Sequence, residues 1–274
     1  MVNFSQKLSC IILLAGQCLL AGCSNDLFGL FGSTPVDERF KERTNFTFLR
    51  PEDRTLSLGD EYSFLVITDT HIENKYIYGL EKIREVIAAD SSIKFVVIVG
   101  DITQNGRRED FEQFIEFART LNVPCYPVIG NHDIYFNTWG NWKDLIGSTV
   151  YRIDGGNTTL LMLDSANATF GKNQLDWLEN QLQSAGGRVF IFSHVNLFVK
   201  SLFSIQQFTD TRERNRICAM LRGRADAMFM GHVHRRIRED VGGVTYLSIE
   251  DFRSNGVYCR VSVSAGGINY HFFK

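Results

Sequence analysis

The chain has 274 residues, of which 44% are hydrophobic and 22% charged, and its formal net charge is −2. This composition is close to a globular average and excludes a disordered or fibrous protein. The near-neutral charge argues against generic nucleic-acid binding, which needs a broad basic surface. Six cysteines are also too few for a disulfide scaffold in a chain of this length.

The N-terminus has the features of an export signal. Lys7 is followed by an apolar stretch that is shorter than the roughly 20 residues needed to span a bilayer. The stretch ends in Leu20-Ala21-Gly22-Cys23, which resembles the lipobox of bacterial lipoproteins. That resemblance implies removal of residues 1–22 and lipidation of Cys23. An ordinary signal peptide that happens to contain a cysteine is the alternative.

Lipidation at Cys23 predicts a protein anchored to the cell envelope and exposed outside the cytoplasm, with the membrane as a partner. No aspartate directly follows Cys23, and by resemblance to Gram-negative lipoproteins this favours the outer membrane. Residues 23–60 show no sustained periodicity, so we expect them to form the lipidated cysteine and a tether. Residues 61–274 are then the folded domain.

The predicted domain alternates apolar runs with segments of helical periodicity. Strands are predicted at 62–68, 95–99, 123–129, 188–192, 227–230 and 244–247. Helices are predicted at 80–87, 111–121 and 175–182, where apolar residues share one face. Hairpins are predicted at 149–163 and 257–273. Because helices between buried strands imply crossovers, and strands outnumber helices, we expect an α/β fold: a two-sheet sandwich flanked by helices.

Polar clusters directly follow five of these strands and hold five of the six histidines in the chain. The clusters are Thr68-Asp69-Thr70-His71, Gly100-Asp101, Gly130-Asn131-His132-Asp133, Ser193-His194 and Gly231-His232-Val233-His234. Because ligands of open α/β sheets bind at the carboxyl ends of strands, we expect the clusters to converge. Imidazole, carboxylate and amide groups together suit divalent metals such as Zn, Mn and Fe.

In their order along the chain, the clusters resemble the five motifs of the calcineurin-like metallophosphoesterase superfamily. The resemblance covers residues 64–234 and makes residues 61–274 a metallophosphoesterase domain with the two-sheet sandwich of that family. It implies a cofactor of two divalent metal ions, Mn, Fe or Zn. The implied ligands are Asp69, His71 and His234 for the first metal, Asn131, His194 and His232 for the second, and Asp101 as the bridge between them.

The resemblance also implies a reaction on a small phosphoester, with a metal-bridging hydroxide as the nucleophile. His132 matches the family histidine that hydrogen-bonds the phosphate and helps to protonate the leaving alkoxide, and Asp133 would orient His132. Gln104 stands where some members place a metal-bound tyrosine, which disfavours the purple-acid-phosphatase type. The loop at 100–106 looks more like the cyclic-nucleotide and glycerophosphodiester phosphodiesterase branch, so phosphodiesters are the favoured substrates.

Three other functions stay open from the sequence. The first is a phosphomonoesterase acting on nucleotides or lipid-linked phosphates. The second is a lipoprotein that binds metal or phosphate without catalysis, and the third is a secreted nuclease, which the net charge disfavours. Aromatic residues after His132 and His194, and arginines after Asp101 and His234, could contact the substrate, but packing and solvated positions explain them equally well.

Overall fold

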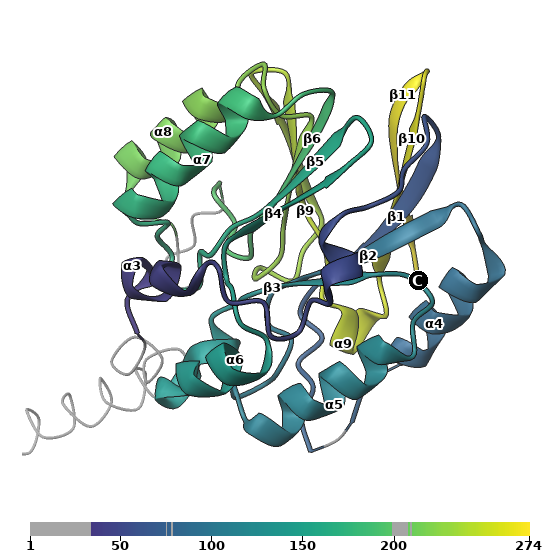
Figure 1. Ribbon diagram of the computed structural model, residues 1–274, viewed down its shortest axis with the longest axis vertical. Coiled ribbons are helices and arrows are strands. Elements are labelled where there is room, and N and C mark those ends of the chain that lie inside the picture. Colours follow the sequence, from purple (N-terminus) through teal and green to yellow (C-terminus); the bar gives the residue numbers. More distant parts are fainter. Residues whose placement is uncertain (1–33, 75, 78, 199–207, 209) are drawn as a thin grey trace, which may run out of the picture.

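The structure is a computed structural model that describes residues 34–74, 76–77, 79–198, 208 and 210–274 (Figure 1). The predicted export signal and Cys23 lie outside the described residues. Within the described part of the chain, helices are all too short or too polar to cross a bilayer.

Two mixed β-sheets form the centre of the fold. The first has the strand order β11-β10-β1-β2-β3, with bounds Gly267–Phe273, Tyr258–Ser264, Tyr62–Ile67, Ile93–Val99 and Cys125–Val128. The second has the order β4-β5-β6-β7-β9-β8, with bounds Tyr151–Gly155, Thr158–Met162, Arg188–Phe192, Ala227–Met230, Val244–Ser248 and Ile237–Val241. Strands β1 to β3 are parallel, as are β5, β6, β7 and β9.

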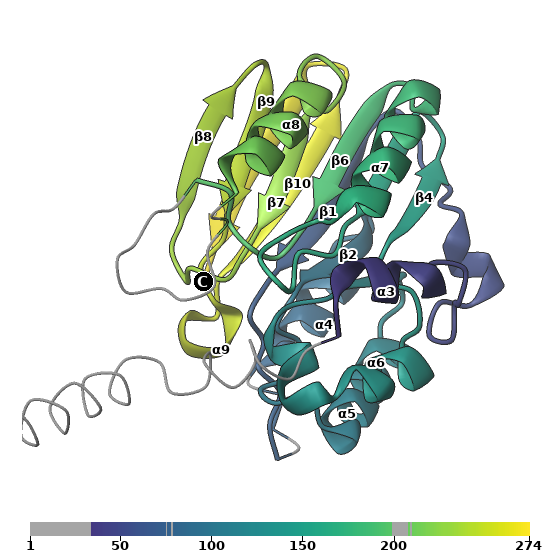
Figure 2. The ribbon, with the colours of Figure 1, turned by 90° about the vertical axis from the view of Figure 1, so that its left-hand side faces the viewer.

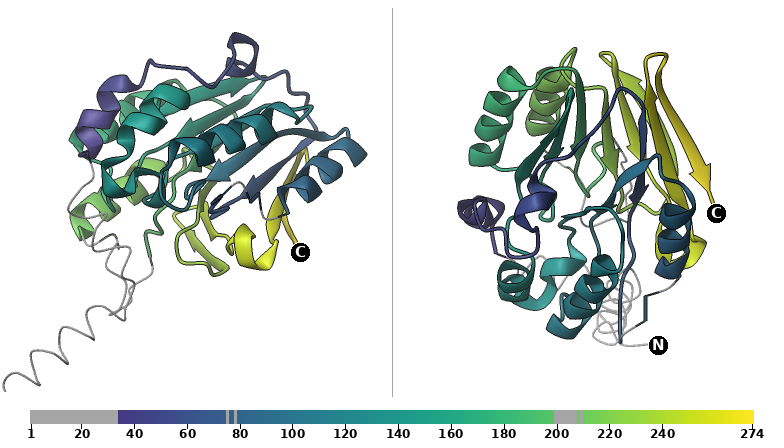
Figure 3. Two further views of the ribbon diagram at one scale, coloured as in Figure 1. Left: turned by 90° about the horizontal axis from the view of Figure 1, so that it is seen from below. Right: turned by 45° about the vertical axis from the view of Figure 1, so that its right-hand side comes forward.

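The two sheets face each other across an apolar core (Figure 3). Aromatic rings from both sheets meet in it. The ring of Phe64 on β1 lies 4.6 Å from that of Phe95 on β2 and 5.1 Å from that of Phe190 on β6. All three side chains are fully buried. Each such ring removes about 150–250 Å² from water, so this layer fixes how the sheets pack.

Helices cover the outer faces of both sheets (Figure 2). α4 (Leu80–Ala89) and α5 (Arg108–Arg119) pack on the first sheet, and α7 (Lys172–Ser184) and α8 (Thr211–Leu221) pack on the second. The short elements are α3 (Val36–Arg39), η1 (Phe40–Glu42), η2 (Pro51–Arg54), η3 (His132–Asn137), α6 (Trp139–Leu145) and α9 (Phe252–Asn255). The predicted two-sheet α/β sandwich flanked by helices is confirmed.

The predicted strands, helices and hairpins are all present, with bounds that differ by a few residues. Several short elements were not predicted, among them α6 and β8. β8 reads Ile-Arg-Glu-Asp-Val, lies at the edge of its sheet and exposes most of its residues. An exposed edge strand buries no apolar face, so its sequence shows no apolar alternation. Backbone pairing with β9 holds it in the sheet.

The segment before β1 differs from the expected tether, because residues 34–60 pack on the sandwich. Val36 and Phe40 are buried. The fully buried guanidinium of Arg39 donates to both carboxylate oxygens of Asp164, at 2.6 and 2.8 Å. The folded unit thus begins well before the predicted boundary at residue 61. The pattern was missed because α3 and η1 are only four and three residues long, too short for a helical period to show in the sequence.

Candidate metal centre

The five polar clusters all lie at the carboxyl ends of strands, in loops from both sheets. Asp69 and His71 follow β1, Asp101 follows β2, Asn131, His132 and Asp133 follow β3, His194 follows β6, and His232 and His234 follow β7. Because β1 to β3 are parallel, and β6 and β7 are parallel, each sheet delivers its loops to one edge. The sandwich then sets the two edges side by side.

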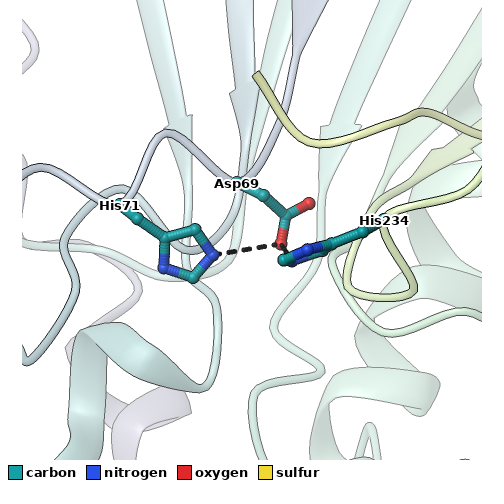
Figure 4. A group of neighbouring side chains, drawn as sticks. All are labelled: Asp69, His71 and His234. Atoms are coloured by element: carbon teal, nitrogen blue, oxygen red, sulfur yellow. Dashed lines mark ion pairs between the residues drawn. The ribbon is translucent and has the colours of Figure 1, made fainter. Parts of the chain in front are cut away.

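The first group of side chains surrounds one oxygen of Asp69. Oδ1 of Asp69 lies 3.2 Å from Nε2 of His234 and 3.7 Å from Nε2 of His71. Figure 4 shows both imidazoles turned toward this carboxylate. One ligand atom from each of the three residues lies within 4.8 Å of the others, a spacing that one cation can bridge.

The second group surrounds Asp101. Oδ2 of Asp101 lies 3.1 Å from Nε2 of His194, and 3.9 Å from Nε2 of both His132 and His71. The ligand atoms of Asp101, His194 and His232 are again within 4.8 Å of one another. The carboxylate of Asp101 therefore stands between the first group, through His71, and the second group, through His194.

The backbone at these residues is held in an unusual conformation. Nine non-glycine residues of the described chain have a positive φ, and five of them belong to the two groups. These five are Asp69, His71, Asp101, His232 and His234, with φ of 53°, 43°, 48°, 71° and 50°. Left-handed backbone is disfavoured for such residues by about 1–3 kcal/mol each and collects at functional sites. The loops are thus shaped to aim side chains at the site.

Two glycines allow the loops to approach each other closely. A Cβ on Gly100, where φ is +79°, would lie 2.3 Å from Nδ1 of His194. A Cβ on Gly130 would lie 2.2 Å from Oδ1 of Asp101. Both distances are far below a van der Waals contact, so any side chain at either position would displace a group of the site.

Burial and mutual attraction control the charges of the site. Burial by itself would raise the pKa of Asp69, but the imidazoles of His194, His234 and His71 hold that pKa well below its ordinary value. Burial would likewise lower the pKa of His194, but the carboxylates of Asp101 and Asp69 raise it to about 10. In the absence of metal, protons on His194 and His234, whose pKa values are both raised by these carboxylates, therefore supply positive charge that the buried carboxylates require.

Unpartnered atoms test whether the site fits a divalent metal. Among the described residues, Oδ1 of Asp69, both ring nitrogens of His71 and Oδ1 of Asn131 are buried without a hydrogen bond of normal geometry. Nδ2 of Asn131 donates to the hydroxyl of Tyr135 at 2.7 Å, which leaves its Oδ1 as the available ligand atom. Each buried unpartnered group costs about 1–3 kcal/mol. Coordination to cations would satisfy the two oxygens and one ring nitrogen of His71, and the donor set fits Zn, Mn or Fe.

The structure corrects the role expected for Asp133. Nδ1 of His132 lies 2.8 Å from the main-chain oxygen of Gln104. The carboxylate of Asp133 instead accepts main-chain N–H groups of Ile102, Thr103 and Gly130, at 3.3, 2.9 and 2.9 Å. Asp133 therefore ties the loops after β2 and β3 together, and the carbonyl group of Gln104 orients the imidazole. Sequence could not separate these two partners, because a main-chain carbonyl has no residue signature.

A sixth strand end also contributes to the site, and sequence analysis missed it. The segment after β9 docks on the first cluster, where the N–H groups of Phe252 and Arg253 donate to the carbonyl oxygens of Thr68 and Asp69 at 2.9 and 3.2 Å. Oδ1 of Asp251 lies 3.9 Å from Nδ1 of His234. The signal that sequence analysis could have used is that these residues directly follow a predicted strand. Because β9 is parallel to β7, both strands end at the same edge of the sheet.

Of the aromatic and arginine side chains considered as substrate contacts, some lie at the surface and others do not. Trp142 is fully buried in the core, whereas Phe136, in the loop after His132, is 53% exposed. Arg236 is paired with Glu250 at 3.0 Å and covers the ring of Phe272. The exposed Phe136 thus stays a candidate, while Trp142 has a packing role.

Comparisons with known proteins indicate the family of this chain. The sequence profile of the family described as calcineurin-like phosphoesterase matches residues 62–236. A protein named "Probable cyclic nucleotide phosphodiesterase" from Fibrobacter succinogenes is 25% identical over 52% of this chain and 58% of its own length. A protein named "Probable glycerophosphodiester phosphodiesterase" from Arcobacter nitrofigilis is 29% identical over 62% of this chain and 70% of its own length. The match thus spans a little over half of the Fibrobacter protein.

Solved structures show the same fold. A purple acid phosphatase from yellow lupin superposes with a TM-score of 0.62 at 14% identity, over 79% of this chain and 52% of that one. A dimetal phosphatase from Danio rerio superposes with a TM-score of 0.57 at 16% identity, over 77% of this chain and 98% of that one. With a family profile that matches more than half of its length, the chain belongs to the calcineurin-like phosphoesterase family.

Proposed function

We propose that the protein is a metal-dependent phosphoric ester hydrolase that acts on small phosphodiesters. The observation that carries this proposal is the position of Asp101, whose carboxylate oxygen lies 3.1 Å from His194 and 3.9 Å from His71. A single carboxylate between two groups of ligands is the arrangement that two neighbouring cations require, because their mutual repulsion must be offset. Membership of a phosphoesterase family supports the reaction class.

The cofactor of this proposal is a pair of divalent ions held by residues of the two groups. Asp69, His71 and His234 would hold one ion, Asn131, His194 and His232 the other, and Asp101 both. Bound there, such ions supply a hydroxide nucleophile at neutral pH and neutralise the oxygens of the phosphoryl group. The chain itself supplies a frame, buried except at His232 and His234, whose side chains are already aimed at each other.

His132 is the proposed acid. Its Nδ1 faces the carbonyl oxygen of Gln104 at 2.8 Å, so this nitrogen carries a proton and donates it in a hydrogen bond. Its Nε2 then faces the site, 3.9 Å from Oδ2 of Asp101. In the imidazolium form Nε2 carries a second proton, and it can pass this proton to the leaving oxygen when the bond from phosphorus breaks, which leaves the neutral ring with its proton on Nδ1. A protein that only binds metal has no need for this group, which disfavours the non-catalytic alternative.

The diester preference rests on the named relatives and on one position of the loop after β2. Both curated relatives reported above carry phosphodiesterase names. Gln104, which replaces the metal-bound tyrosine of some family members, uses its side chain to accept a hydrogen bond from Arg253 at 2.6 Å. A monoesterase acting on nucleotides is the competing outcome. We expect no nucleic acid as substrate, because the net charge of −2 gives no broad basic surface.

The same proposal places the protein on the cell envelope. Cys23 would be lipidated and would anchor the chain outside the cytoplasm, with the outer membrane favoured. Ten residues separate Cys23 from Thr34, the first described residue, and an extended chain spans at most about 3.6 Å per residue. Cys23→Ser should abolish incorporation of labelled palmitate and release the protein from membranes. Continued membrane binding of that variant would contradict the anchor.

Activity on a defined substrate panel tests the enzyme. The full chain, loaded with Mn²⁺ or Zn²⁺, is assayed on cyclic nucleotides, glycerophosphodiesters and an aryl phosphodiester, with nucleotide monophosphates for comparison. Diesters should be cleaved faster than monoesters, and chelation with EDTA should stop the reaction. His194→Ala should lose more than about 100-fold in kcat, beyond the usual effect of residues that only support a ligand. Metal-loaded protein without activity on any member of the panel would overturn the proposal.

A further inference from the structure

We propose that Arg253 is a positioning residue for His132 and that it acts through Gln104. The inference rests on the proposed function, because it assumes that His132 protonates the leaving group. Arg253 lies outside the five motif clusters, in α9, after the strand end that the sequence analysis missed. Its guanidinium connects this segment to the loops that follow β1 and β2.

The guanidinium of Arg253 is held at one place by two loops. Nη1 donates to Oε1 of Gln104 at 2.6 Å, and Nη2 lies 3.5 Å from Oε2 of Glu73. The main-chain N–H of Arg253 donates to the carbonyl oxygen of Asp69 at 3.2 Å, which fixes the start of the side chain. Because the side chain is only 30% exposed, the hydrogen bond to Gln104 is partly shielded from water.

Gln104 passes this restraint to His132. The carbonyl oxygen of Gln104 is the group that faces Nδ1 of His132 at 2.8 Å. Its main-chain N–H donates to the carbonyl oxygen of Ile72 at 3.0 Å. The residue is therefore held at its backbone by one loop and at its side-chain amide by Arg253, with the acceptor for His132 between the two. Loss of the amide contact would remove one of the restraints on the direction of this carbonyl group.

The direction of that carbonyl matters because it decides how the imidazole of His132 is turned. A histidine that donates from Nδ1 presents Nε2 to the site, and the partner on Nδ1 fixes both the proton and the ring orientation. General acid catalysis contributes about 10²–10⁴ in rate and depends on placement to within a fraction of a bond length. A slack carbonyl would therefore weaken the acid without removing it.

The chemical step predicts a specific signature. A water-derived oxygen bonds to phosphorus, the bond from phosphorus to the leaving oxygen breaks, and the Nε2 proton of His132 passes to that oxygen. Solvent then returns a proton to His132, which closes the proton balance. An alkyl leaving group departs as a strong base and needs this proton, whereas an aryl leaving group departs readily as an anion. Damage to the acid therefore affects alkyl diesters far more than aryl diesters.

The experiment compares the two leaving groups in the metal-loaded full chain. Arg253→Met should lower kcat on an alkyl diester by about 10- to 100-fold and on an aryl diester by less than about 3-fold. Arg253→Lys keeps one donor within reach of Gln104 and should recover part of the loss. Gln104→Ala, which keeps the main-chain carbonyl but removes the amide, should reproduce the Arg253→Met pattern. The double variant should add little to either, because both act on one contact.

Arg238→Met is the matched control, since Arg238 pairs with Asp240 at 2.9 Å on the exposed strand β8 and should leave both rates unchanged. Equal losses on both diesters for Arg253→Met and Gln104→Ala would show a structural role and overturn the inference. Unchanged rates would also overturn it, and so would a rise in KM alone, which would make Arg253 a substrate contact. His132→Ala separates the two proposals: if it shows the leaving-group pattern and the Arg253 variants do not, the inference fails and the function stands.

Discussion

Oδ2 of Asp101 lies 3.1 Å from Nε2 of His194, although Asp101 follows a strand of the first sheet and His194 follows a strand of the second. Both side chains are buried. The site therefore exists only where the two halves of the sandwich meet, and packing between the sheets sets its geometry. Changes that disturb this contact should affect metal binding before they affect either sheet.

Asp101→Asn tests the charge of this central carboxylate. The variant keeps the shape of the side chain but removes the negative charge that would lie between two cations. We expect bound metal to fall below that of the wild type and kcat to fall by more than about 100-fold, as measured by elemental analysis and diester hydrolysis. Asp240→Asn, on the exposed strand β8, is the control and should change neither. Full metal content in the Asp101 variant would refute a bridging role.

The stability of the metal-free protein should depend on pH through His194. Its pKa in the folded chain is raised to about 10, above the ordinary value of about 6.5. The folded state then binds the proton more tightly than the unfolded state, so this stabilisation is complete below about pH 6.5 and is lost as the pH rises toward 10.

Thermal unfolding measures this effect. After EDTA treatment, the Tm should fall by several degrees between pH 7 and pH 9.5, and His194→Gln should flatten the curve. Metal-loaded protein should lack this loss and should release protons on binding, because a metal takes the neutral imidazole. A Tm of the chelated protein that stays level, or rises, over this range would contradict the expected charge state.

Gly100→Ala should damage the site through a direct clash. The new Cβ would lie 2.3 Å from Nδ1 of His194, at a backbone φ of +79°. We expect a loss of about 2–4 kcal/mol in the free energy of unfolding, from left-handed strain and overpacking together, with weaker metal binding. Gly59→Ala is the matched control, because a Cβ there meets nothing within 4 Å. Urea unfolding measures the stability of both variants. If Gly100→Ala is as stable as Gly59→Ala, the loop after β2 can move aside to accommodate the new side chain.

Arg39→Met should destabilise the whole domain, because it leaves the fully buried carboxylate of Asp164 without its partner. Removing one member of a buried pair costs about 3–5 kcal/mol. Replacing both, in Arg39→Met with Asp164→Asn, should recover part of the loss. Lys172→Met breaks an exposed pair with Asp176 and should cost less than about 1 kcal/mol. If the urea midpoint of Arg39→Met equals that of the wild type, the segment before β1 does not stabilise the sandwich.

Local patterns in the sequence were enough to predict most of the strands and helices and to identify the polar clusters that follow strand ends. Helix α4 was predicted because Leu80, Ile83 and Ile87 recur on one face, and they are the residues that this helix buries. Strands β1 and β2 were predicted because they contain nearly continuous apolar runs, as is typical of strands covered on both faces. Each of these patterns lies within one element, because the spacing of its apolar residues depends only on which face of that helix or strand is buried.

By itself, the sequence thus determined most of the strands and helices, and that five of its histidines and several of its aspartates follow strand ends. Only the tertiary structure decided that Asp101 stands between two groups, that Gln104 and not Asp133 faces the ring of His132, and that Arg39 pins residues before β1 to the sandwich. The physical reason is that those contacts join segments far apart in the chain. Their partners depend on sheet order and packing, and a main-chain carbonyl that serves as a partner leaves no mark in the sequence.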